Sequence, residues 1–396
     1  MSGKIPTCQN DITKQWLIEV LRFPKSATET EDNDVEVNEL VTIKEKNGFL
    51  SGVAKAKVII NGQGKNLFVK TIVDPDDPFH DYSCISNFDE VEVRFYKEYL
   101  PAIVEFTKEQ MGIENDNTTA TILENMVPKF YSGDYCLEKE QRGFYLIMDD
   151  LSSQYRMKNG PEGLNFKQIN DALIKIAKFH SAAYAFNMKY PDKVQSWKLK
   201  CWLNEWFKDP EIDKLMNTCF DNFIKDLEKD SPDLITPVSN LKQKWLELFK
   251  ASLVFDERFI SHADLWINNV MACDDTDTSM ILDWQSLAPD HPVMDVAFLL
   301  CTSLTPENLD QCINDLIKSY VDAFQKTCLQ FKIKIPFNFD EFQKMFYEKG
   351  VVLIFMIWMS AYDESINFFK TLVQPHFKSR FIWQLRKVLE TSELLK

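Results

Sequence analysis

The sequence has no Cys-x-x-Cys pair, and its nine cysteines are scattered and odd in number. Zinc sites and disulfide frameworks use closely or regularly spaced cysteines, so we expect neither. The first residues lack the apolar core of a signal peptide, and Ser2 stands where N-myristoylation needs glycine. We therefore expect free thiols and a cytoplasmic protein.

Positive charge is also scarce. The chain has 45 Lys and Arg against 60 Asp and Glu, a net charge of −15. Binding to nucleic acid or to an anionic membrane depends on Lys and Arg, so we expect neither partner. The longest apolar run, residues 351–361, is too short to span a bilayer and predicts a buried helix.

We expect the protein to be a monomer.

Aromatic side chains, in contrast, make up 13% of the 396 residues, with 30 Phe. This length suits two or three domains or one two-lobed enzyme. So many aromatics predict large buried clusters or an aromatic-lined pocket. Residues 196–256 predict amphipathic helices, and periodicity does not decide between core and substrate vestibule for their aromatics: Trp197, Trp202, Trp206, Phe207, Phe220, Phe223, Trp245 and Phe249.

Residues 261–285 carry spaced groups suited to metal-assisted phosphoryl transfer. Asp264 could accept the proton of an attacking hydroxyl, while Asn269 and Asp283 could hold Mg²⁺ against nucleotide phosphates. The residues from His262 to Asn269 follow the H-x-D-x-x-x-x-N spacing of a kinase catalytic loop. Asp283 then stands where a second metal ligand returns on the next strand. The spacing, rather than any single residue, carries this prediction.

Residues 11–22 predict a helix, and residues 40–73 predict three strands. Asn61-Gly62 is a hairpin signal between the second and third strands. The earlier turn, residues 47–52, could fold over phosphates with Ser51 pointing inward. It does not match G-x-G-x-x-G, and an ordinary hairpin turn is the alternative.

Lys70 interrupts the apolar strand at residues 67–73. Alternation would turn it to solvent, but it occupies the place of the kinase lysine that contacts the α- and β-phosphates. Its partner should be a Glu on the helix predicted at residues 88–100. We choose Glu92 over Glu90; an i,i+4 surface pair, such as Glu90 with Arg94, is the alternative.

Residues 143–148 predict a strand that runs into acidic residues and Leu151. A hinge between two kinase lobes has this pattern, and backbone groups of Met148, Asp149 and Leu151 would then bind the adenine edge. The alternative is a strand end that faces water. Residues 107–120 are polar, and we expect them to be irregular.

Beyond residue 149 the chain is predominantly helical. His180 lies on the apolar face of a helix predicted at residues 166–184, which favours a hydrogen-bonded core histidine over a ligand. We therefore predict an α+β, two-lobed, protein-kinase-like fold. Its β-rich N-terminal lobe would be residues 1–148 and its helical C-terminal lobe residues 149–396.

The segments SHADLWINNVM, MILDWQ and PDHPVMDVAFLL resemble the choline-kinase-like branch of the protein-kinase-like superfamily. Within that branch they are most similar to the ecdysteroid kinase-like phosphotransferases. LFVKTIV, the segment around Glu92 and KFHSAAYA also resemble that family. The resemblance implies an ATP- and Mg²⁺-dependent kinase that phosphorylates a hydroxyl of an ecdysteroid or a hydroxylated xenobiotic.

The resemblance also implies roles for individual residues. Asp264 would be the base and His262 would brace its loop. Asn269 and Asp283 would bind Mg²⁺, and Lys70 with Glu92 would anchor the phosphates. Asp295 falls on an Asp that supports the catalytic loop through its backbone.

Ala263 departs from the family pattern, which has Gly at this position. If the position needs φ > 0, Ala costs about 1 kcal/mol of strain. Such a cost is tolerable.

Three other functions are alternatives. Intact charged positions argue against a nucleotide-binding pseudokinase scaffold. A protein kinase is disfavoured because only eleven residues separate Asp283 from Asp295, with neither D-F-G nor A-P-E. A choline or ethanolamine kinase would need a cage for a cation. The C-terminal aromatics suit either a bulky apolar alcohol or a cation, and we favour the bulky alcohol: Phe355, Trp358, Phe368 and Phe369.

Overall fold

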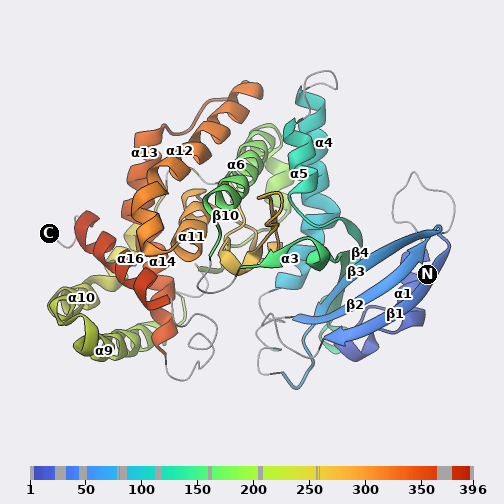
Figure 1. The fold of residues 1–396 in the computed structure, drawn as a ribbon, viewed down its shortest axis with the longest axis horizontal. Helices are drawn as coiled ribbons and strands as arrows, with labels where there is room; N and C mark the ends of the chain where they lie inside the picture. Colours follow the sequence, from blue (N-terminus) through green and yellow to red (C-terminus); the bar gives the residue numbers. More distant parts are fainter. Residues whose placement is uncertain are drawn as a thin grey trace. The chain divides into compact units, whose positions relative to one another are not determined.

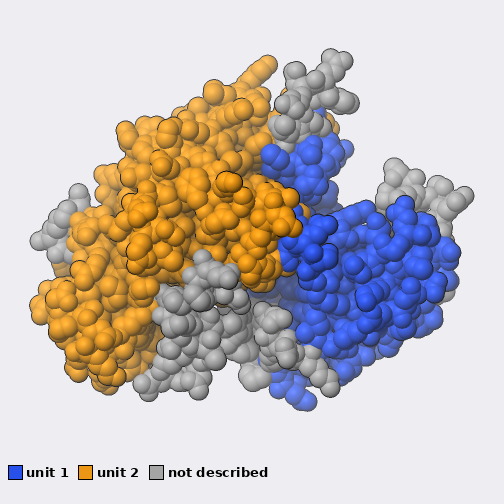
Figure 2. Space-filling view, in the orientation of Figure 1, with its two compact units in different colours: residues 1–108, 120–155, 282–286 blue, residues 109–119, 156–281, 287–396 orange. Residues whose placement is uncertain are grey.

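A computed structural model of the chain describes residues 4–22, 33–43, 51–77, 80, 87–111, 118–158, 163–203, 208–255, 257, 259–363 and 377–392. The chain divides into two compact units, coloured separately in Figure 2. The first unit comprises residues 1–108, 120–155 and 282–286, and the second comprises residues 109–119, 156–281 and 287–396. The lobes predicted from the sequence are single segments, whereas these units are discontinuous. Residues 282–286, which include Asp283, belong to the first unit.

The first unit contains a five-stranded antiparallel sheet with the order β1-β2-β3-β5-β4 (Figure 1). Its strands are β1 (Val35–Ile43), β2 (Ser51–Ile60), β3 (Gln63–Ile72), β4 (Phe130–Cys136) and β5 (Gly143–Asp149). The predicted hairpin between β2 and β3 is confirmed. Asn61 and Gly62 both have positive φ, 49° and 76°, as a two-residue type I′ turn requires.

Helix α1 (Lys14–Arg22) packs on this sheet, after the short turn η1 (Gln9–Asp11). Its apolar residues recur at helical spacing, so one face is buried while the charged face is exposed. Trp16 meets Tyr145 of β5 edge to face, with ring centroids 5.1 Å apart. The helix predicted at this position is confirmed.

One helical stretch follows the sheet's third strand. It comprises α3 (Phe88–Arg94), the π-helical turn η2 (Phe95–Tyr99) and α4 (Leu100–Met111), and α5 (Thr118–Asn125) comes next. The prediction that residues 107–120 are irregular was therefore wrong for 107–111 and 118–120. Ile103, Val104 and Phe106 bury one face of α4, and burial of that face outweighs the polar composition of its end.

The second unit is mostly helical, as predicted (Figure 1). Its helices are α6 (Phe166–Lys189), α7 (Pro191–Ser196), α9 (Ile212–Asp230), α10 (Ile235–Ser252), α11 (Val293–Ser303), α12 (Pro306–Gln330), α13 (Phe339–Met345), α14 (Val351–Met359) and α16 (Phe377–Thr391). Two small antiparallel sheets join β7 (Phe259–Ser261) to β10 (Ala288–Asp290), and β6 (Arg156–Met157) to β8 (Val270–Ala272) and β9 (Ser279–Ile281). The predicted α+β class is confirmed.

The apolar run predicted as a buried helix forms α14, and eight of its nine side chains are buried. It belongs to a longer helical stretch, Phe339–Tyr362, of 24 residues. Among the described residues this stretch alone has the length and composition of a membrane span. However, 67% of its most apolar window is buried inside the protein, which is the pattern of a core helix.

Most aromatic residues of segment 196–256 are core. Trp202 is half-buried, while Trp206 and Phe207 lie outside the described residues. Phe355 is core too, because it is fully buried and stacks on Phe381 at 4.6 Å. Phe368 and Phe369 are not among the described residues. The buried set in segment 196–256 comprises Trp197, Phe220, Phe223, Trp245 and Phe249.

Gly143 provides a test of how the N-terminal segment packs. A Cβ at this position would overlap the backbone carbonyl of Pro6, so Gly143→Ala must displace that segment. We expect a loss of about 2 kcal/mol in the free energy of unfolding, measured by urea denaturation. Gly64→Ala is the control, because its Cβ would meet no atom within 4 Å. Equal stability of the two variants would show that Pro6 does not pack against β5.

Candidate active site

Lys70 is a buried cation in the middle of β3, with 8% of its surface exposed. Its Nζ lies 2.7 Å from Glu92 Oε2 and 2.6 Å from Asp283 Oδ1. Burial disfavours the charged ammonium, but the two carboxylates outweigh burial and raise the pKa of Lys70. The ammonium therefore stays charged between two carboxylates.

The choice of Glu92 over Glu90 as the partner of Lys70 is confirmed. Glu92 lies on α3 with 1% of its surface exposed. Burial raises the pKa of Glu92, and the charge of Lys70 opposes this rise, so the carboxylate depends on Lys70 to stay ionised. Glu90 instead bonds Arg94 on the next helical turn, at 3.2 Å.

Asp283 has a left-handed backbone with φ of 61°. Its Oδ1 bonds Lys70, its Oδ2 lies 3.4 Å from Gln285 Nε2, and 28% of its side chain is exposed. The next residue, Trp284, is fully buried and stacks flat on Phe95 at 4.1 Å. This stack anchors the short segment that carries Asp283 to the helix that carries Glu92.

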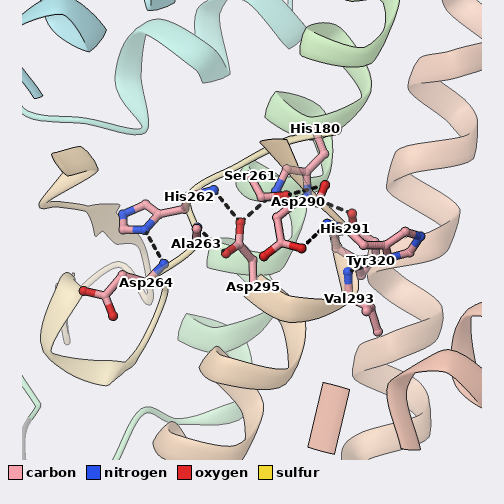
Figure 3. A network of polar contacts seen from close by, with 10 residues as sticks. All are labelled: His180, Ser261, His262, Ala263, Asp264, Asp290, His291, Val293, Asp295 and Tyr320. Carbon is pink, nitrogen blue, oxygen red and sulfur yellow. Dashed lines mark hydrogen bonds and ion pairs between the residues drawn. The ribbon is translucent and has the colours of Figure 1, made fainter. Parts of the chain in front are cut away.

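Within the second unit, a buried carboxylate shapes the turn before Asp264 (Figure 3). Asp295, in the first turn of α11, accepts hydrogen bonds from the backbone N–H of His262 at 2.7 Å and of Ala263 at 2.8 Å. Ala263 has φ of 63°, so the position does use the conformation that favours glycine. The strain costs about 1–2 kcal/mol. Two hydrogen bonds to an ionised group offset such a cost.

Asp264 follows that turn and is half-buried. Asn269 Nδ2 donates to the Asp264 carbonyl at 2.7 Å and to its Oδ2 at 3.1 Å. His262 Nδ1 accepts from the Asp264 N–H at 3.3 Å. Asp264 is thus held on both sides by residues of its own loop. His262, Asp264 and Asn269, which the sequence motif places at fixed spacing, are thus in direct hydrogen-bond contact.

His180 is fully buried on α6, as predicted for a core histidine. Its Nε2 lies 2.9 Å from Asp295 Oδ2, and its Nδ1 lies 2.8 Å from the Tyr320 hydroxyl. The histidine therefore connects α6 and α12 to the carboxylate that shapes the catalytic loop. Sequence reasoning missed Tyr320, because nothing in the helical pattern of α12 distinguishes it from other buried positions.

Two further contacts were missed. Trp202 donates from Nε1 to the Ala263 carbonyl at 3.0 Å, and Thr302 Oγ1 accepts from the Ile267 N–H at 3.1 Å. Both partners are far from the loop in the sequence. The aromatic richness near residue 202 was a signal, but it did not identify which tryptophan contacts the loop.

The β8–β9 hairpin starts directly after Asn269 and is braced from α6. Lys175 Nζ donates to the Ser279 carbonyl at 2.6 Å, and Asp171 Oδ2 accepts from the Ser279 N–H at 2.8 Å and its hydroxyl at 2.7 Å. Lys175 and Asp171 also bond each other at 2.7 Å. Together these two side chains of α6 hold the first residue of β9.

The sequence model of the ecdysteroid kinase-like family matches residues 46–333, well over half of the chain. This chain belongs to the ecdysteroid kinase-like family. The matched region includes Lys70, Glu92, Asp264, Asn269 and Asp283. The resemblance read from the sequence motifs is thereby confirmed, and no curated protein sequence matches the chain.

Solved structures similar to this ecdysteroid kinase-like protein include a choline kinase from Cryptosporidium parvum Iowa II. It is 14% identical with a TM-score of 0.42, covering 90% of this chain and 89% of that one. A Plasmodium vivax ethanolamine kinase is 10% identical with a TM-score of 0.41, covering 90% and 82%. A macrolide 2′-phosphotransferase type I is 10% identical with a TM-score of 0.38, covering 90% and 92%. The family assignment rests on the sequence match.

The ecdysteroid kinase-like protein offers oxygen donors of the kind that Mg²⁺ prefers. The Asn269 side-chain nitrogen donates to Asp264, so the other side-chain atom, Oδ1, is the acceptor. Asn269 Oδ1 accepts no hydrogen bond from a described residue. Asp283 adds a partly exposed carboxylate. Among the described residues no group of three His, Cys, Asp or Glu side chains could hold a metal alone. These two oxygen donors, one in each unit, are of the kind that Mg²⁺ prefers.

The residues predicted to contact the rest of a nucleotide remain predictions. Ser51 was expected in a turn, but it is the first residue of β2 and pairs with Ile72. Residues 47–50, most of that turn, lie outside the described residues. Ser51 is half-buried at the strand end.

The predicted hinge follows β5. Met148 is buried and pairs with Phe68 and Phe130 on the two neighbouring strands. The Asp149 N–H donates to the Lys129 carbonyl, and the Asp150 N–H donates to the Asn66 carbonyl, both at 2.9 Å. The N–H groups of Asp149 and Asp150 therefore already donate to backbone carbonyls. The predicted donor to adenine is then the N–H of Leu151, at the start of the following 3₁₀ turn.

His291 directly follows β10 and is packed between aromatic rings. It stacks on Phe255 with ring centroids 4.6 Å apart, and Phe259 meets its edge at 5.4 Å. Its Nδ1 accepts from the Val293 N–H at 3.2 Å. Burial lowers the pKa of His291 to about 3, and the nearby charge of Lys349 acts in the same direction.

This shift predicts a loss of stability in acid. In the unfolded chain His291 titrates near its usual pKa of about 6.5, so between pH 6.5 and pH 3 the unfolded state binds the extra proton. The free energy of unfolding should fall by up to about 1.4 kcal/mol per pH unit across that window. Urea denaturation at pH 7, 6 and 5 measures the slope. His291→Asn, which keeps an acceptor but does not titrate, should show a shallower slope; identical slopes would contradict the prediction.

Proposed function

We propose that this protein transfers the γ-phosphoryl group of ATP to a hydroxyl group of a small molecule. The observation that supports this most is the buried ammonium of Lys70, bonded to both Glu92 and Asp283. A lysine held charged beside a carboxylate that can ligate Mg²⁺ suits binding of nucleotide phosphates. Membership of a kinase-like family supports the same reaction.

In the proposed reaction Asp264 is the general base. The acceptor hydroxyl approaches the γ-phosphorus and gives its proton to the Asp264 carboxylate. The new bond joins the acceptor oxygen to phosphorus, the bond to the β-phosphate oxygen breaks, and ADP leaves. His262 and Asn269 keep the carboxylate oriented. Most of the rate enhancement comes from positioning rather than covalent catalysis.

Lys70, with Glu92 as its partner, anchors the α- and β-phosphates in this proposal. Asn269 and Asp283 hold Mg²⁺, which when bound neutralises charge on the phosphates. Lys70 must then exchange part of its contact with Asp283 for phosphate oxygens. Ser51 and the backbone near Met148, Asp149 and Leu151 contact the nucleotide, with Leu151 as the amide donor.

We propose that the acceptor is a bulky apolar alcohol of the ecdysteroid or hydroxylated xenobiotic type. Phe355 no longer supports this, because it is buried in the core. Trp202 and Trp266 support it instead. Both are half-buried, Trp202 bonds the residue before Asp264, and Trp266 follows Asp264 by two positions. Large flat indole rings beside the base suit an acceptor with an extended apolar body.

We also propose that the protein acts as a cytoplasmic monomer without a nucleic-acid or membrane partner. The net charge of −15 supports the absence of polyanionic partners. Eight described cysteines are free thiols, five of them buried, which is compatible with a reducing compartment.

Substitution of the two carboxylates separates chemistry from binding. Asp264→Asn should lower kcat by about 10²–10⁴-fold while ATP binding is retained, because only the base is lost. Asp283→Asn should weaken Mg²⁺-dependent ATP binding. Calorimetric ATP titration and ADP release measure the two properties. Asp275→Asn, an exposed carboxylate in the turn between β8 and β9, is the control and should match the wild type.

A different outcome would support the pseudokinase scaffold. In that case the wild type binds Mg²⁺–ATP but releases no ADP with any acceptor, and Asp264→Asn changes nothing. Sustained phosphorylation of a panel of proteins would instead support a protein kinase. Either result would contradict the proposed small-molecule reaction.

An acceptor screen tests the substrate class. ATP consumption should rise with polyhydroxylated steroids or phenolic glycosides and stay at background with choline and ethanolamine. Trp266→Ala should raise KM for the active alcohol about tenfold with little effect on KM for ATP, because it removes apolar contact area. Turnover of choline in preference to every apolar alcohol would contradict the substrate class but not the reaction.

A further inference from the structure

A buried chain of hydrogen bonds runs from α12 to the catalytic loop (Figure 3). The Tyr320 hydroxyl lies 2.8 Å from His180 Nδ1, and His180 Nε2 lies 2.9 Å from Asp295 Oδ2. The same Oδ2 accepts the His262 N–H, and Oδ1 accepts the Ala263 N–H. The three side chains of the chain, Tyr320, His180 and Asp295, have no exposed surface. Each polar atom therefore depends on its neighbour in the chain rather than on bulk water.

The acceptor capacity of Asp295 determines where the protons lie. An ionised carboxylate has no proton to donate, so His180 Nε2 must carry the proton between them. In the neutral ring Nδ1 is then an acceptor and needs a donor. The Tyr320 hydroxyl is positioned to be that donor. Burial and the charge of Asp295 raise the pKa of Tyr320, so the hydroxyl keeps its proton.

The direction of the Tyr320 hydroxyl is itself fixed by packing. The ring stacks on Phe342 with centroids 5.0 Å apart, and Phe324 lies on α12 one turn away at 6.2 Å. An aromatic ring held in this way has little rotational freedom. Its hydroxyl therefore remains directed at His180.

We propose that Tyr320 is a positioning residue for phosphotransfer. Its hydroxyl donates to His180 Nδ1, and this bond fixes the ring orientation in which Nε2–H bonds the Asp295 carboxylate, which in turn bonds the loop that carries Asp264. This inference deepens the proposed function and rests on it, because its kinetic consequence requires Asp264 to be the base.

Loss of the Tyr320 hydroxyl leaves the buried Nδ1 without a donor, while Asp295 keeps the proton on Nε2. The ring is then no longer oriented from α12, so the 2.9 Å bond from Nε2–H to Asp295 Oδ2 lengthens. The carboxylate must move, and its bonds to the His262 and Ala263 N–H groups weaken. Ala263, with φ of 63°, has no glycine-like freedom to keep the turn without them. Asp264 follows directly in the chain and shifts with the turn.

The first experiment reads the tautomer and needs no enzymatic activity. Full-length protein labelled with ¹⁵N-histidine has five histidines, so the His180 signals are assigned by comparison with His180→Gln. We expect Nε2–H in both proteins, with the Nε2–H proton resonance of His180 moved upfield in Tyr320→Phe because its bond to Asp295 is longer. Tyr184→Phe is the matched control, because Tyr184 is on α6 with its hydroxyl 3.2 Å from Glu257 and does not contact His180 through that bond.

The second experiment reads the consequence for turnover. Tyr320→Phe should lower kcat about tenfold, the size of effect seen when a supporting hydrogen bond is removed, with KM for ATP unchanged. In a His180→Gln background the amide nitrogen can donate to Asp295 permanently, so Tyr320→Phe should cause no further loss. A purely structural role for Tyr320 would instead give the same loss in both backgrounds. Thermal denaturation of each variant checks that it is folded.

Three results would overturn the inference: an Nδ1–H or doubly protonated His180 in the wild type, an unchanged Nε2–H resonance in Tyr320→Phe, or equal losses in both backgrounds. A wild type that binds ATP but transfers no phosphoryl group overturns the proposed function and, with it, the positioning role. In that case the nuclear magnetic resonance result still shows whether Tyr320 orients His180. The two failures are thus distinguishable.

Discussion

Burial of one carboxylate, that of Asp295, is the constraint on which the catalytic loop depends. A charge with no exposed surface is stable only when its oxygens accept hydrogen bonds, and here two backbone N–H groups and His180 provide them. Removing any donor leaves a costly unpaired charge. The backbone N–H groups before Asp264 therefore stabilise the buried Asp295 carboxylate, and a change in the core around Asp295 would also shift Asp264.

In the first unit the buried charge is positive rather than negative. Lys70 is a cation between Glu92 and Asp283, so helix α3 and the short segment around Asp283 are drawn to the same strand. The stack of Trp284 on Phe95 adds a nonpolar contact between those elements. Because Asp283 still has an exposed fraction while Glu92 has almost none, Asp283 is the carboxylate of the pair that is able to exchange partners.

Both segments contain a residue with left-handed backbone geometry: Ala263, directly before Asp264, and Asp283. Such conformations are costly for residues other than glycine and persist only when surrounding contacts determine them. For Ala263 the contacts are the Asp295 hydrogen bonds. For Asp283 they are the ion pair with Lys70 and the burial of Trp284. Backbone strain is thus present at two residues of the predicted site, and in each case the contacts named above offset it.

The sequence by itself determined the features that depend on local pattern. The strands and their Asn61-Gly62 turn, helix α1, the burial of His180 and the catalytic spacing all follow from periodicity or from short-range chemistry, and the choice of Glu92 as the partner of Lys70 held as well. Only the tertiary structure decided which aromatics are core and that α4 continues through a polar segment. It also decided that Tyr320 contacts His180, that Trp202 contacts the loop and that Lys175 contacts its hairpin. Those contacts join residues more than fifty positions apart, and their energies come from burial and hydrogen-bond partners that no local pattern records.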